Sequence, residues 1–305
     1  MRSALPASLR SMLRPASAFA RRIPRLRDRW RTVRARRAFE RATAGPAWLD
    51  VPDLERLQAS YPFRPEYDYG PEATRARGCE RRAALLSRWP RGAEPARRVL
   101  EVGCGEGMTA VAFREAGAQV FASDVEISRF DIRARESGVR LAAMDASRLG
   151  VRGGWADLVV SFEALEHVPD PGRALSECAR AVRTGGLIFL SFGPLYLSPW
   201  GLHARRSIAF PYGQALFPIE VLETFARRCG REFIPPGFVN GWKPGRFRAL
   251  WEGAPRSLEV ISLEVSRDES HVDLIERYPS CFRDKTDRFE DLIETSIHVL
   301  LRRIV

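Results

Sequence analysis

Apolar and polar residues alternate in short runs through the middle of the chain, and the runs predict strands and helices in turn. Five strands are expected at residues 98–102, 119–124, 139–144, 156–161 and 187–192. Apolar residues at helical spacing fill three of the gaps, at about 107–117, 126–137 and 172–182. Strands that alternate with helices indicate a parallel sheet with crossover helices. The pattern therefore predicts an α/β fold with helices on both faces of the sheet.

The pattern is less regular on both sides of this region. Residues 71–89 and 217–229 have the spacing of amphipathic helices. The aromatic-rich residues 232–265 are predicted to form extended segments, including Phe247 to Trp251 and 258–265. Residues 297–304 favour a last antiparallel strand. We therefore expect three parts. These are an Arg-rich extension over 1–45, a helical cap over 46–95, and a main domain over 96–305 with insertions at 193–216 and 232–290.

The net charge of +11 lies entirely in the first part of the chain. Residues 1–41 hold 13 arginines and only two acidic residues, Asp28 and Glu40, whereas the remainder holds 36 basic and 36 acidic residues. A neutral main domain gives no reason to expect a specific nucleic-acid partner. The basic segment predicts a disordered arm or a peripheral contact with an anionic membrane, and its composition overlaps with transit peptides. Residues 28–43 could form a short basic helix that carries Trp30, Val33 and Phe39.

Cysteine usage and hydropathy bear on location. The five cysteines are scattered and form no C-x-x-C pair, which favours a reducing compartment over a disulfide framework or a zinc site. No stretch approaches the roughly 18 apolar residues of a membrane span. We expect a cytoplasmic protein, or one attached peripherally to a membrane.

The most informative stretch is residues 98–109, in which a strand runs into a glycine-rich turn and then a helix. The turn reads E-x-G-x-G-x-G, from Glu101 through Gly103 and Gly105 to Gly107. Glycine is needed where φ is positive or where a ligand lies against the backbone. A dinucleotide-binding loop has the different spacing G-x-G-x-x-G. A structural turn and a dehydrogenase loop are the alternative interpretations.

Three acidic residues stand at the ends of successive predicted strands. Glu101, Asp124 and Asp145 end the first three strands and fall at the carboxyl edge of the sheet. Open α/β folds bind ligands at that edge. Each acid alone could instead cap a helix, but three in register with the glycine loop favour a ligand site.

Residues 156–192 carry a specific resemblance. They read ADLVVSFEALEHVPDPGRALSECARAVRTGGLIFLSF, and this stretch is similar to the type 11 branch of class I S-adenosylmethionine (SAM)-dependent methyltransferases, which includes the ubiquinone and menaquinone biosynthesis enzymes. The resemblance covers roughly residues 95–195. It implies a Rossmann-like, seven-stranded, mostly parallel sheet, SAM as cofactor and methyl-transfer activity.

The resemblance also implies roles for individual residues. The expected cofactor-binding residues are Glu101, Gly103, Cys104, Gly105, Gly107, Asp124, Val125, Asp145, Ala146 and Phe162. Asp124 would accept both ribose hydroxyls, and Asp145 with the Ala146 N–H would meet the adenine. Family members that methylate exocyclic amines carry a Pro-Pro-aromatic run where this chain has Ser161, Phe162 and Glu163. Its absence favours O- or C-methylation of a small molecule.

The motif E-x-x-E-H places Glu163, Glu166 and His167 on one face of a helical turn. Two carboxylates and an imidazole can bind a divalent cation, and some relatives hold Mg²⁺ with this spacing. The competing interpretations are a metal-free acid/base pair and a structural element. A Mg²⁺ cofactor is therefore the less favoured of the alternatives.

Residues 193–206, which follow the fifth predicted strand, should border the acceptor pocket. They supply His203, which is a candidate base beside His167, a further metal ligand or a structural residue of the loop. They also supply Arg205 and Arg206, which could hold an acidic acceptor or be solvated. Upstream, the tyrosines between residues 61 and 69 either cover the cofactor or pack the preceding helix onto the core.

These observations favour a SAM-dependent methyltransferase that acts on a small-molecule or lipid- or glycan-linked acceptor, with O-methylation as the expected reaction. The alternative is a non-catalytic SAM-fold binding or regulatory protein, recruited to a membrane by its basic arm. A nicotinamide-dependent oxidoreductase is disfavoured by the spacing of the glycines.

Overall fold

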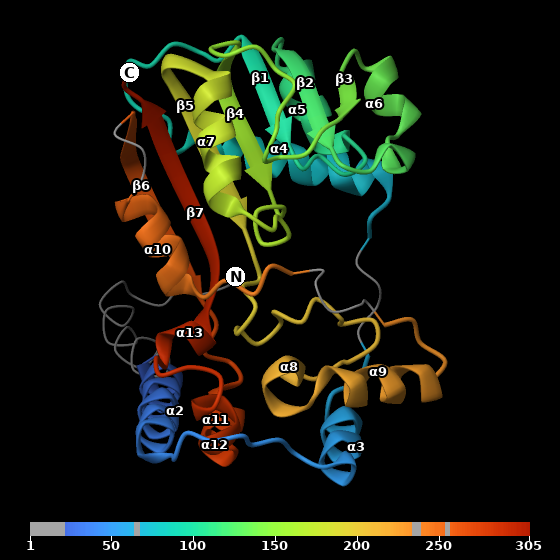
Figure 1. Ribbon diagram of the computed structural model, residues 1–305, viewed down its shortest axis with the longest axis vertical. Coiled ribbons are helices and arrows are strands. Elements are labelled where there is room, and N and C mark those ends of the chain that lie inside the picture. The colour runs from blue at the N-terminus through green and yellow to red at the C-terminus, as the bar shows by residue number, and fades with distance from the viewer. Residues whose placement is uncertain (1–21, 64–67, 234–238, 254–256) are drawn as a thin grey trace, which may run out of the picture.

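The chain folds into two parts, a sheet body and a helical lobe. Figure 1 shows the computed structural model, which describes residues 22–63, 68–233, 239–253 and 257–305, with side chains from Asp28 onward. The sheet body comprises residues 71–192, 239–267 and 294–303. The helical lobe comprises residues 22–61, 193–233 and 268–293 and lies below the body in the figure.

The sheet body is built on seven strands in the order β3-β2-β1-β4-β5-β7-β6. The strands are β1 (Arg98–Val102), β2 (Gln119–Asp124), β3 (Arg140–Ala143), β4 (Ala156–Phe162), β5 (Val182–Phe192), β6 (Leu258–Arg267) and β7 (Glu294–Arg303). The pairs from β3 to β5 are parallel, and β7 is antiparallel to both β5 and β6. The predicted Rossmann-like, seven-stranded, mostly parallel sheet is confirmed.

Helices cover both faces of this sheet, because successive side chains of a strand point to opposite sides. One face carries α4 (Pro71–Leu86), α5 (Met108–Glu115), the turn η2 (Ile127–Arg129) and α6 (Ile132–Glu136), and the other carries α7 (Pro171–Ala181) and α10 (Pro244–Glu252). Val99 packs with the α5 side of the core, whereas its neighbour Leu100 packs with the α7 side. Because β1 to β5 run parallel, their carboxyl ends all point toward the helical lobe (Figure 1).

The helical lobe has its own hydrophobic core, formed by three stretches that are distant in sequence. Its helices are α2 (Arg22–Arg41), α3 (Val51–Ser60), α8 (Gly213–Leu216), α9 (Ile219–Arg228), α11 (Val272–Arg277), α12 (Pro279–Arg283) and α13 (Glu290–Ile293). Tyr212, which is fully buried, stacks edge-on against Phe282 and donates its hydroxyl to the Leu292 carbonyl. These three residues tie the loop before α8 to the segment around α12 and α13.

The later part of the basic segment is a helix, as expected for residues 28–43, and not a disordered extension. From Arg22 it forms α2, whose residues Ala35 and Phe39 are buried in the lobe core. Arg31 pairs with Asp273 at 3.0 Å and Arg36 with Glu290 at 2.8 Å. Charged and apolar contacts therefore hold the helix to the lobe, while residues 1–21 lie outside the described residues.

The expected domain boundaries also differ from the observed ones. The segment expected as a helical cap divides, because α3 packs in the lobe and α4 packs against α5. The prediction that Phe247 to Trp251 are extended is wrong. Pro244 starts helix α10, and Phe247, Leu250 and Trp251 meet the core at helical spacing. Among the helices of the described residues, none combines the length and apolar character needed to cross a bilayer.

Candidate functional site

The glycine loop lies where β1 turns into α5, and its backbone requires glycine. Gly103, Gly105 and Gly107 have φ values of 74°, 54° and 83°. A Cβ atom at Gly103 would lie 2.3 Å from the Ala164 Cβ, and one at Gly107 would lie 2.7 Å from the Leu141 Cδ2. The loop is therefore packed so closely that no side chain fits at two of its three glycines.

Hydrogen bonds from the neighbouring strand fix the path of the loop. The Gly103 and Cys104 N–H groups both donate to the Ser123 carbonyl, at 2.8 and 2.9 Å. One oxygen of Asp124 accepts from the Gly105 N–H at 2.8 Å, and the other accepts from the Glu126 N–H at 3.2 Å. Each carboxylate oxygen keeps a further lone pair. Asp124 can therefore hold the loop and still accept hydrogen bonds from a ligand.

Glu101 brings a buried carboxyl group to the base of the loop. It is 1% exposed, and its Oε2 has no hydrogen-bond partner among the described residues. Burial raises the pKa of Glu101 to about 8, while the nearby positive charge of Arg81 acts in the opposite direction. A buried acceptor without a partner costs free energy in the free protein. This oxygen therefore fits a ligand that brings a hydrogen-bond donor.

The adenine side predicted from the sequence lies at the end of β3. Asp145 is exposed and accepts from the Ser147 N–H at 2.7 Å, in the manner of an Asx turn. Val125 is also exposed, directly after Asp124. The Gly103 and Ala146 backbones border one small apolar cavity of about 30 Å³, which extends between β4 and α7.

Two of the predicted cofactor residues have their side chains in the core instead. The Phe162 ring is stacked on Phe113 at 6.4 Å and edge-on to Phe189 at 6.0 Å. The Cys104 thiol is buried, and burial raises its pKa far above the ordinary range, which keeps it protonated and unreactive. We infer that these two residues can contribute only backbone atoms to a ligand.

The turn that carries E-x-x-E-H follows β4 directly. Glu163 has a φ of 52°, a conformation rare outside glycine. Glu166 is 1% exposed and accepts from the Gly193 N–H at 3.0 Å, and burial raises the pKa of Glu166 to about 8. Glu166 therefore links this turn to the loop that follows β5.

The possible metal site at Glu163, Glu166 and His167 is not formed. Over the described ranges, no three His, Cys, Asp or Glu side chains lie where they could hold a metal ion. Glu163 Oε1 instead lies 3.9 Å from Arg81 Nη2, and the His167 Nε2 is 3.9 Å from the Glu166 Oε1. The turn does not wind as a regular helix, so the three side chains do not share one face.

The two candidate catalytic histidines are brought together. The rings of His167 and His203 lie edge to face with their centres 4.9 Å apart. His203 has a φ of 57° and donates from Nε2 to the Pro194 carbonyl at 2.8 Å. Burial lowers the pKa of His203 to about 4. His203 is therefore a neutral imidazole near pH 7, with its proton on Nε2.

The arginines and tyrosines near this loop form stacked pairs. Arg205 lies 4.1 Å from the centre of the Trp200 ring, and Arg206 lies 5.2 Å from that of Tyr69. Tyr61 packs edge-on against His271 in the helical lobe, as expected for a packing role. Tyr67 lies outside the described residues.

The structure adds Arg81 of α4, which no motif marked in the sequence. Its Nη1 donates to the Thr109 Oγ1 at 3.3 Å, at the start of α5. Its guanidinium also lies 5.2 Å from the centre of the Phe162 ring. Arg81 thus places a positive charge between the glycine loop and Glu163. Only the packing of α4 on α5 brings it there, so periodicity alone could not reveal it.

Asn240 is a second residue that the sequence did not mark. Its side-chain amide donates to the carbonyls of Leu165 and Val168, at 2.8 and 2.9 Å. Its backbone N–H donates to the Glu166 carbonyl at 2.7 Å. The segment before α10 therefore holds the Glu163–His167 turn in place.

Comparisons with known proteins agree with this geometry. Residues 100–190 match the family model described as a methyltransferase domain, of type 11. The chain is 39% identical over 106 residues to the ubiquinone biosynthesis O-methyltransferase of Bordetella avium. This match covers 33% of this chain and 44% of that protein. It is 34% identical over 139 residues to the enzyme of the same name from Rhizobium johnstonii, covering 42% and 54%.

The chain thus spans about half the length of the curated relatives that it matches. Among solved structures, it is similar to a SAM-dependent methyltransferase from Mesorhizobium loti, at 21% identity and a TM-score of 0.43, covering 72% of this chain and 96% of that one. The family match lies over the glycine loop and the turn after β4. Residues 100–190 of the chain therefore match a methyltransferase domain of type 11, and the chain is distantly homologous to the ubiquinone biosynthesis O-methyltransferases.

Proposed function

We propose that the protein transfers a methyl group from SAM to a hydroxyl of a small-molecule or lipid- or glycan-linked acceptor. One observation carries this proposal. The glycine loop, Asp124, Asp145 and the His167–His203 pair all follow the carboxyl ends of neighbouring strands of one methyltransferase domain. The curated relatives are named O-methyltransferases, which supports the oxygen acceptor.

The residues named above offer a partner for each part of SAM. The orphaned Glu101 Oε2 and the cation of Arg81 would meet the ammonium and carboxylate of the methionine part. Asp124 would accept the ribose hydroxyls, and Asp145 with the Ala146 N–H would meet the adenine. When bound, SAM supplies a methyl group on a positively charged sulfur. Most of the rate enhancement then comes from holding the acceptor in line with that methyl group.

The histidine pair would remove the proton from the acceptor hydroxyl. His203 is neutral near pH 7 because burial lowers its pKa to about 4. The hydrogen bond to the Pro194 carbonyl keeps the proton on Nε2, so Nδ1 is the basic atom. His167, in edge contact with that ring, is the other candidate base. A positioned base contributes about 10²–10⁴-fold to the rate when its pKa lies near the working pH, so a His203 with a pKa of about 4 would contribute less than this.

Calorimetry with S-adenosylhomocysteine tests cofactor binding directly. We expect Asp124→Ala to weaken binding at least about a hundredfold, since it removes a charged acceptor and a contact that fixes the loop. The control is Asp50→Ala, which deletes a carboxylate that accepts a backbone N–H at the start of α3 in the lobe. No binding by the unaltered protein would sink the proposal.

A radiolabelled methyl-transfer screen over catechols, quinone precursors, sugars and lipid-linked glycans tests the reaction. It should be run with Mg²⁺ and with EDTA, and we expect equal rates because the acidic residues of the site do not converge on a metal. Binding of S-adenosylhomocysteine with no transfer to any acceptor would favour the non-catalytic alternative. If transfer is found, we expect His167→Ala or His203→Ala to reduce it.

We further propose a contact between α2 and an anionic membrane. Trp30 is 63% exposed, and Val33 lies one turn further along the same outer face. The exposed side chains of Arg29, Arg37 and Arg41 flank them. An aromatic residue among arginines is the composition of a helix that lies in the membrane interface.

Point substitutions test this contact better than a truncation, because deletion of residues 1–44 would remove Phe39 from the lobe core. We expect Trp30→Ser with Arg37→Glu to reduce co-sedimentation with vesicles of about 30% phosphatidylserine by several-fold. Arg91→Glu makes the same charge change on an exposed site of the sheet body. Equal losses in both variants would remove α2 from the proposal.

A further inference from the structure

The segment from Met144 to Val151 leads from β3 toward β4 and carries the residues expected to recognise adenine. Its start is fixed to the ribose side of the site, because the Met144 N–H donates to the Asp124 carbonyl at 2.9 Å. Its far end is buried, with Leu149 and Val151 4% and 7% exposed in the core beside α7. Between these ends, the Asp145 carboxylate accepts from the Ser147 N–H, and the Asp145 carbonyl accepts from the Arg148 N–H at 2.9 Å.

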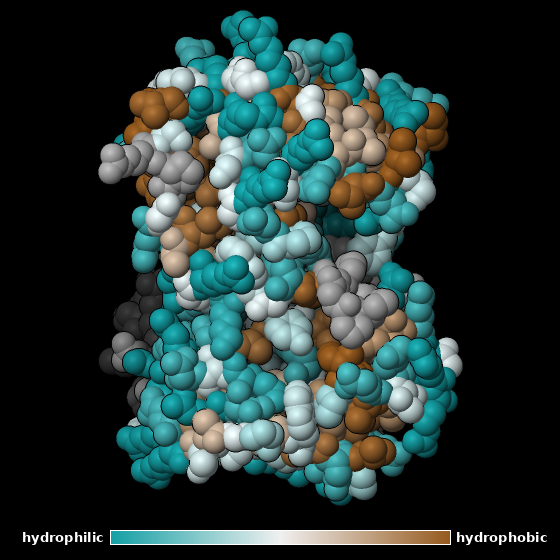
Figure 2. Space-filling model, in the orientation of Figure 1, coloured by the Kyte–Doolittle hydropathy of each residue, from teal (hydrophilic) through white to brown (hydrophobic). Residues whose placement is uncertain are grey.

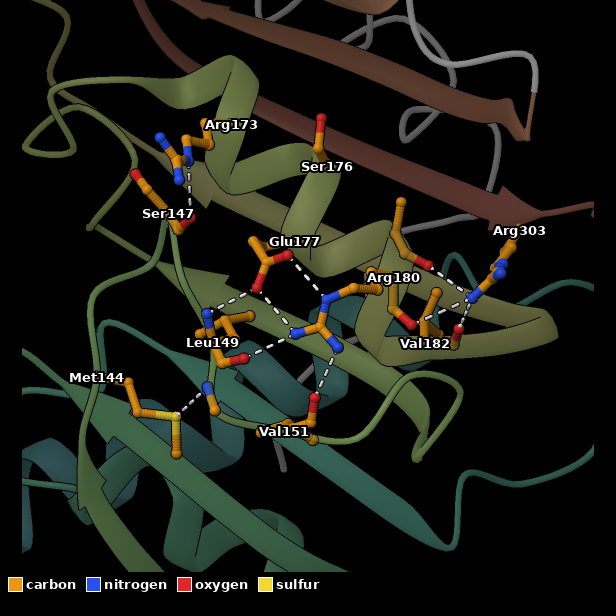
Figure 3. A network of polar contacts seen from close by, with 12 residues as sticks. Met144, Ser147, Leu149, Val151, Arg173, Ser176, Glu177, Arg180, Val182 and Arg303 are labelled. Atoms are coloured by element: carbon orange, nitrogen blue, oxygen red, sulfur yellow. Dashed lines mark hydrogen bonds and ion pairs between the residues drawn. The ribbon is translucent and has the colours of Figure 1, made fainter.

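Three polar side chains of α7 reach across to this segment. Arg173, Glu177 and Arg180 are spaced by four and three residues, which places them on one face of the helix (Figure 3). Glu177 Oε2 accepts from the Leu149 N–H at 2.7 Å. Arg180 donates to the carbonyls of Leu149 and Val151, both at 2.7 Å. Arg173 Nε donates to the Ser147 carbonyl at 3.1 Å.

The two central side chains also hold each other. Arg180 Nε donates to Glu177 Oε1 and Nη2 donates to Oε2, both at 2.8 Å, in a two-pronged pair (Figure 3). The hydrogen bond from Arg180 lowers the pKa of Glu177, so the carboxylate stays ionised at neutral pH. One planar ion pair therefore satisfies two carbonyls and one N–H of the segment at once.

The helix end that carries this pair is itself fixed to the sheet. Arg303 of β7 donates from Nη1 to the carbonyls of Ala179, Arg180 and Val182, at 2.9, 3.2 and 2.7 Å (Figure 3). These are carbonyls that a helix leaves without an internal partner at its end. The pair is therefore anchored to the sheet through Arg303, and it holds the far end of the segment at Leu149 and Val151.

We propose that Glu177 and Arg180 are positioning residues for adenine recognition, holding residues 144–151 so that Asp145 and the Ala146 N–H face the adenine ring. This inference rests on the proposed binding of SAM. Neither side chain touches the cofactor. Both act through the backbone of Leu149 and Val151, four or more residues from Asp145.

Hydrogen exchange of the ligand-free protein tests the first half of this inference. We expect Glu177→Ala to speed amide exchange over residues 147–151 by about tenfold or more, because the Leu149 N–H loses its acceptor. Glu177→Gln keeps an acceptor oxygen and should exchange at an intermediate rate. The control is Glu223→Ala in α9, which removes a carboxylate from a similar intrahelical pair with Arg227. Unchanged exchange over residues 147–151 would overturn the proposal.

Calorimetry with two ligands tests the second half. S-adenosylhomocysteine carries the adenine amino group, and S-inosylhomocysteine has a carbonyl there, which Asp145 would repel. We expect Glu177→Ala to lower the affinity for S-adenosylhomocysteine about tenfold and the affinity for S-inosylhomocysteine much less. The ratio of the two affinities should therefore fall. Equal weakening of both ligands would contradict an adenine-specific role.

The two measurements also separate this inference from the proposed function. If the unaltered protein binds neither ligand, SAM binding and adenine recognition both fail. The exchange rates would then show only whether Glu177 fixes the segment.

Discussion

The sheet body is built mainly from segments that are close in sequence, whereas the helical lobe is built from segments that are far apart. In the parallel part of the body, most neighbouring strands are consecutive in sequence, as in the pairs β1–β2, β2–β3 and β4–β5. In the lobe, α2 packs against α11 and α12, some 240 residues away. Figure 2 shows that the outline of the molecule is indented on the right where the two parts meet.

The two parts contribute different groups to the candidate site. The body supplies the glycine loop and the acidic residues that would hold a cofactor, all on strand ends. The lobe supplies the loop with His203 and the stacked arginines, which border the expected acceptor side. We therefore expect changes in the lobe to affect stability and the acceptor, and changes at the strand ends to affect the cofactor.

The largest effect should come from Phe39→Ala in the core of the lobe. Phe39 is 1% exposed and packs edge-on against Phe289. We expect the free energy of unfolding to fall by about 3–5 kcal/mol, as for other buried aromatic residues. Urea denaturation measures this, and Val33→Ala on the exposed side of the same helix is the control. S-adenosylhomocysteine affinity should change less than twofold, and a tenfold loss would show that the two parts are not separable.

The next effect is a pH dependence at Glu166, which joins the body to the lobe loop. The pKa of Glu166 is raised to about 8, so between about pH 4.5 and 8 the folded protein keeps a proton that the unfolded chain releases. The contribution of this group to stability therefore falls as the pH rises through that window.

Glu166→Gln mimics the protonated carboxyl group and removes this dependence. We expect the stability of the variant relative to the unaltered protein to rise by about 2–4 kcal/mol between pH 5 and pH 8.5, since each pKa unit is worth about 1.4 kcal/mol. Urea denaturation at the two pH values measures it. A constant difference across the window would show that Glu166 is ionised throughout.

A smaller effect is expected at Arg81, on the body side of the site. Arg81→Gln removes the positive charge beside the glycine loop and should weaken S-adenosylhomocysteine about tenfold, as the loss of one charged contact. Stability should change little, because the Arg81 side chain is partly exposed. Arg91→Gln, on an exposed site of the body, is the matched control in the same titration. Equal affinities of the two variants would exclude a role for Arg81.

The smallest effect is expected for the exposed ion pairs between α2 and α11. Arg34 and Glu276 lie 3.2 Å apart with side chains 62% and 35% exposed. A double-mutant cycle with Arg34→Ala and Glu276→Ala should give a coupling of about 0.2–1 kcal/mol. A coupling above about 2 kcal/mol would mean that charge, and not the burial of Phe39, attaches the helix.

The sequence predicted the body far better than the lobe, and the physical reason is the range of the contacts. The strands at 98–102 and 119–124 were predicted to the residue, because a buried strand bounded by glycine or an acid is a local signal. Leu54, Leu57 and Phe39 look like ordinary apolar residues of short helices. Nothing near them in the sequence shows that they share a core with Phe282.

The residues of the candidate site were also predicted where they lie on strand ends and missed where packing between elements brings them in. Glu101, Asp124 and Asp145 could be placed on one edge because parallel strands bring their ends together. The three possible metal ligands do not come together. Their spacing indicated a helical turn at residues 163–167, whereas the chain forms an irregular turn with Glu163 at positive φ. Arg81 and Asn240 enter through packing between elements, which a single sequence does not encode locally.

The position of β7 has a consequence for the order in which the protein can fold during synthesis. It is the last strand along the sequence, yet it separates β5 from β6. While a ribosome adds the residues from the end of β6 to the end of β7, roughly 2–7 s at ordinary rates, β6 has no strand to pair with. Leu258 of β6, which is 8% exposed in the folded protein, would be available to chaperones in that interval. Over the same seconds α2 would lack the acidic partners of α11, so the nascent body would be nearly complete while the lobe had not yet formed.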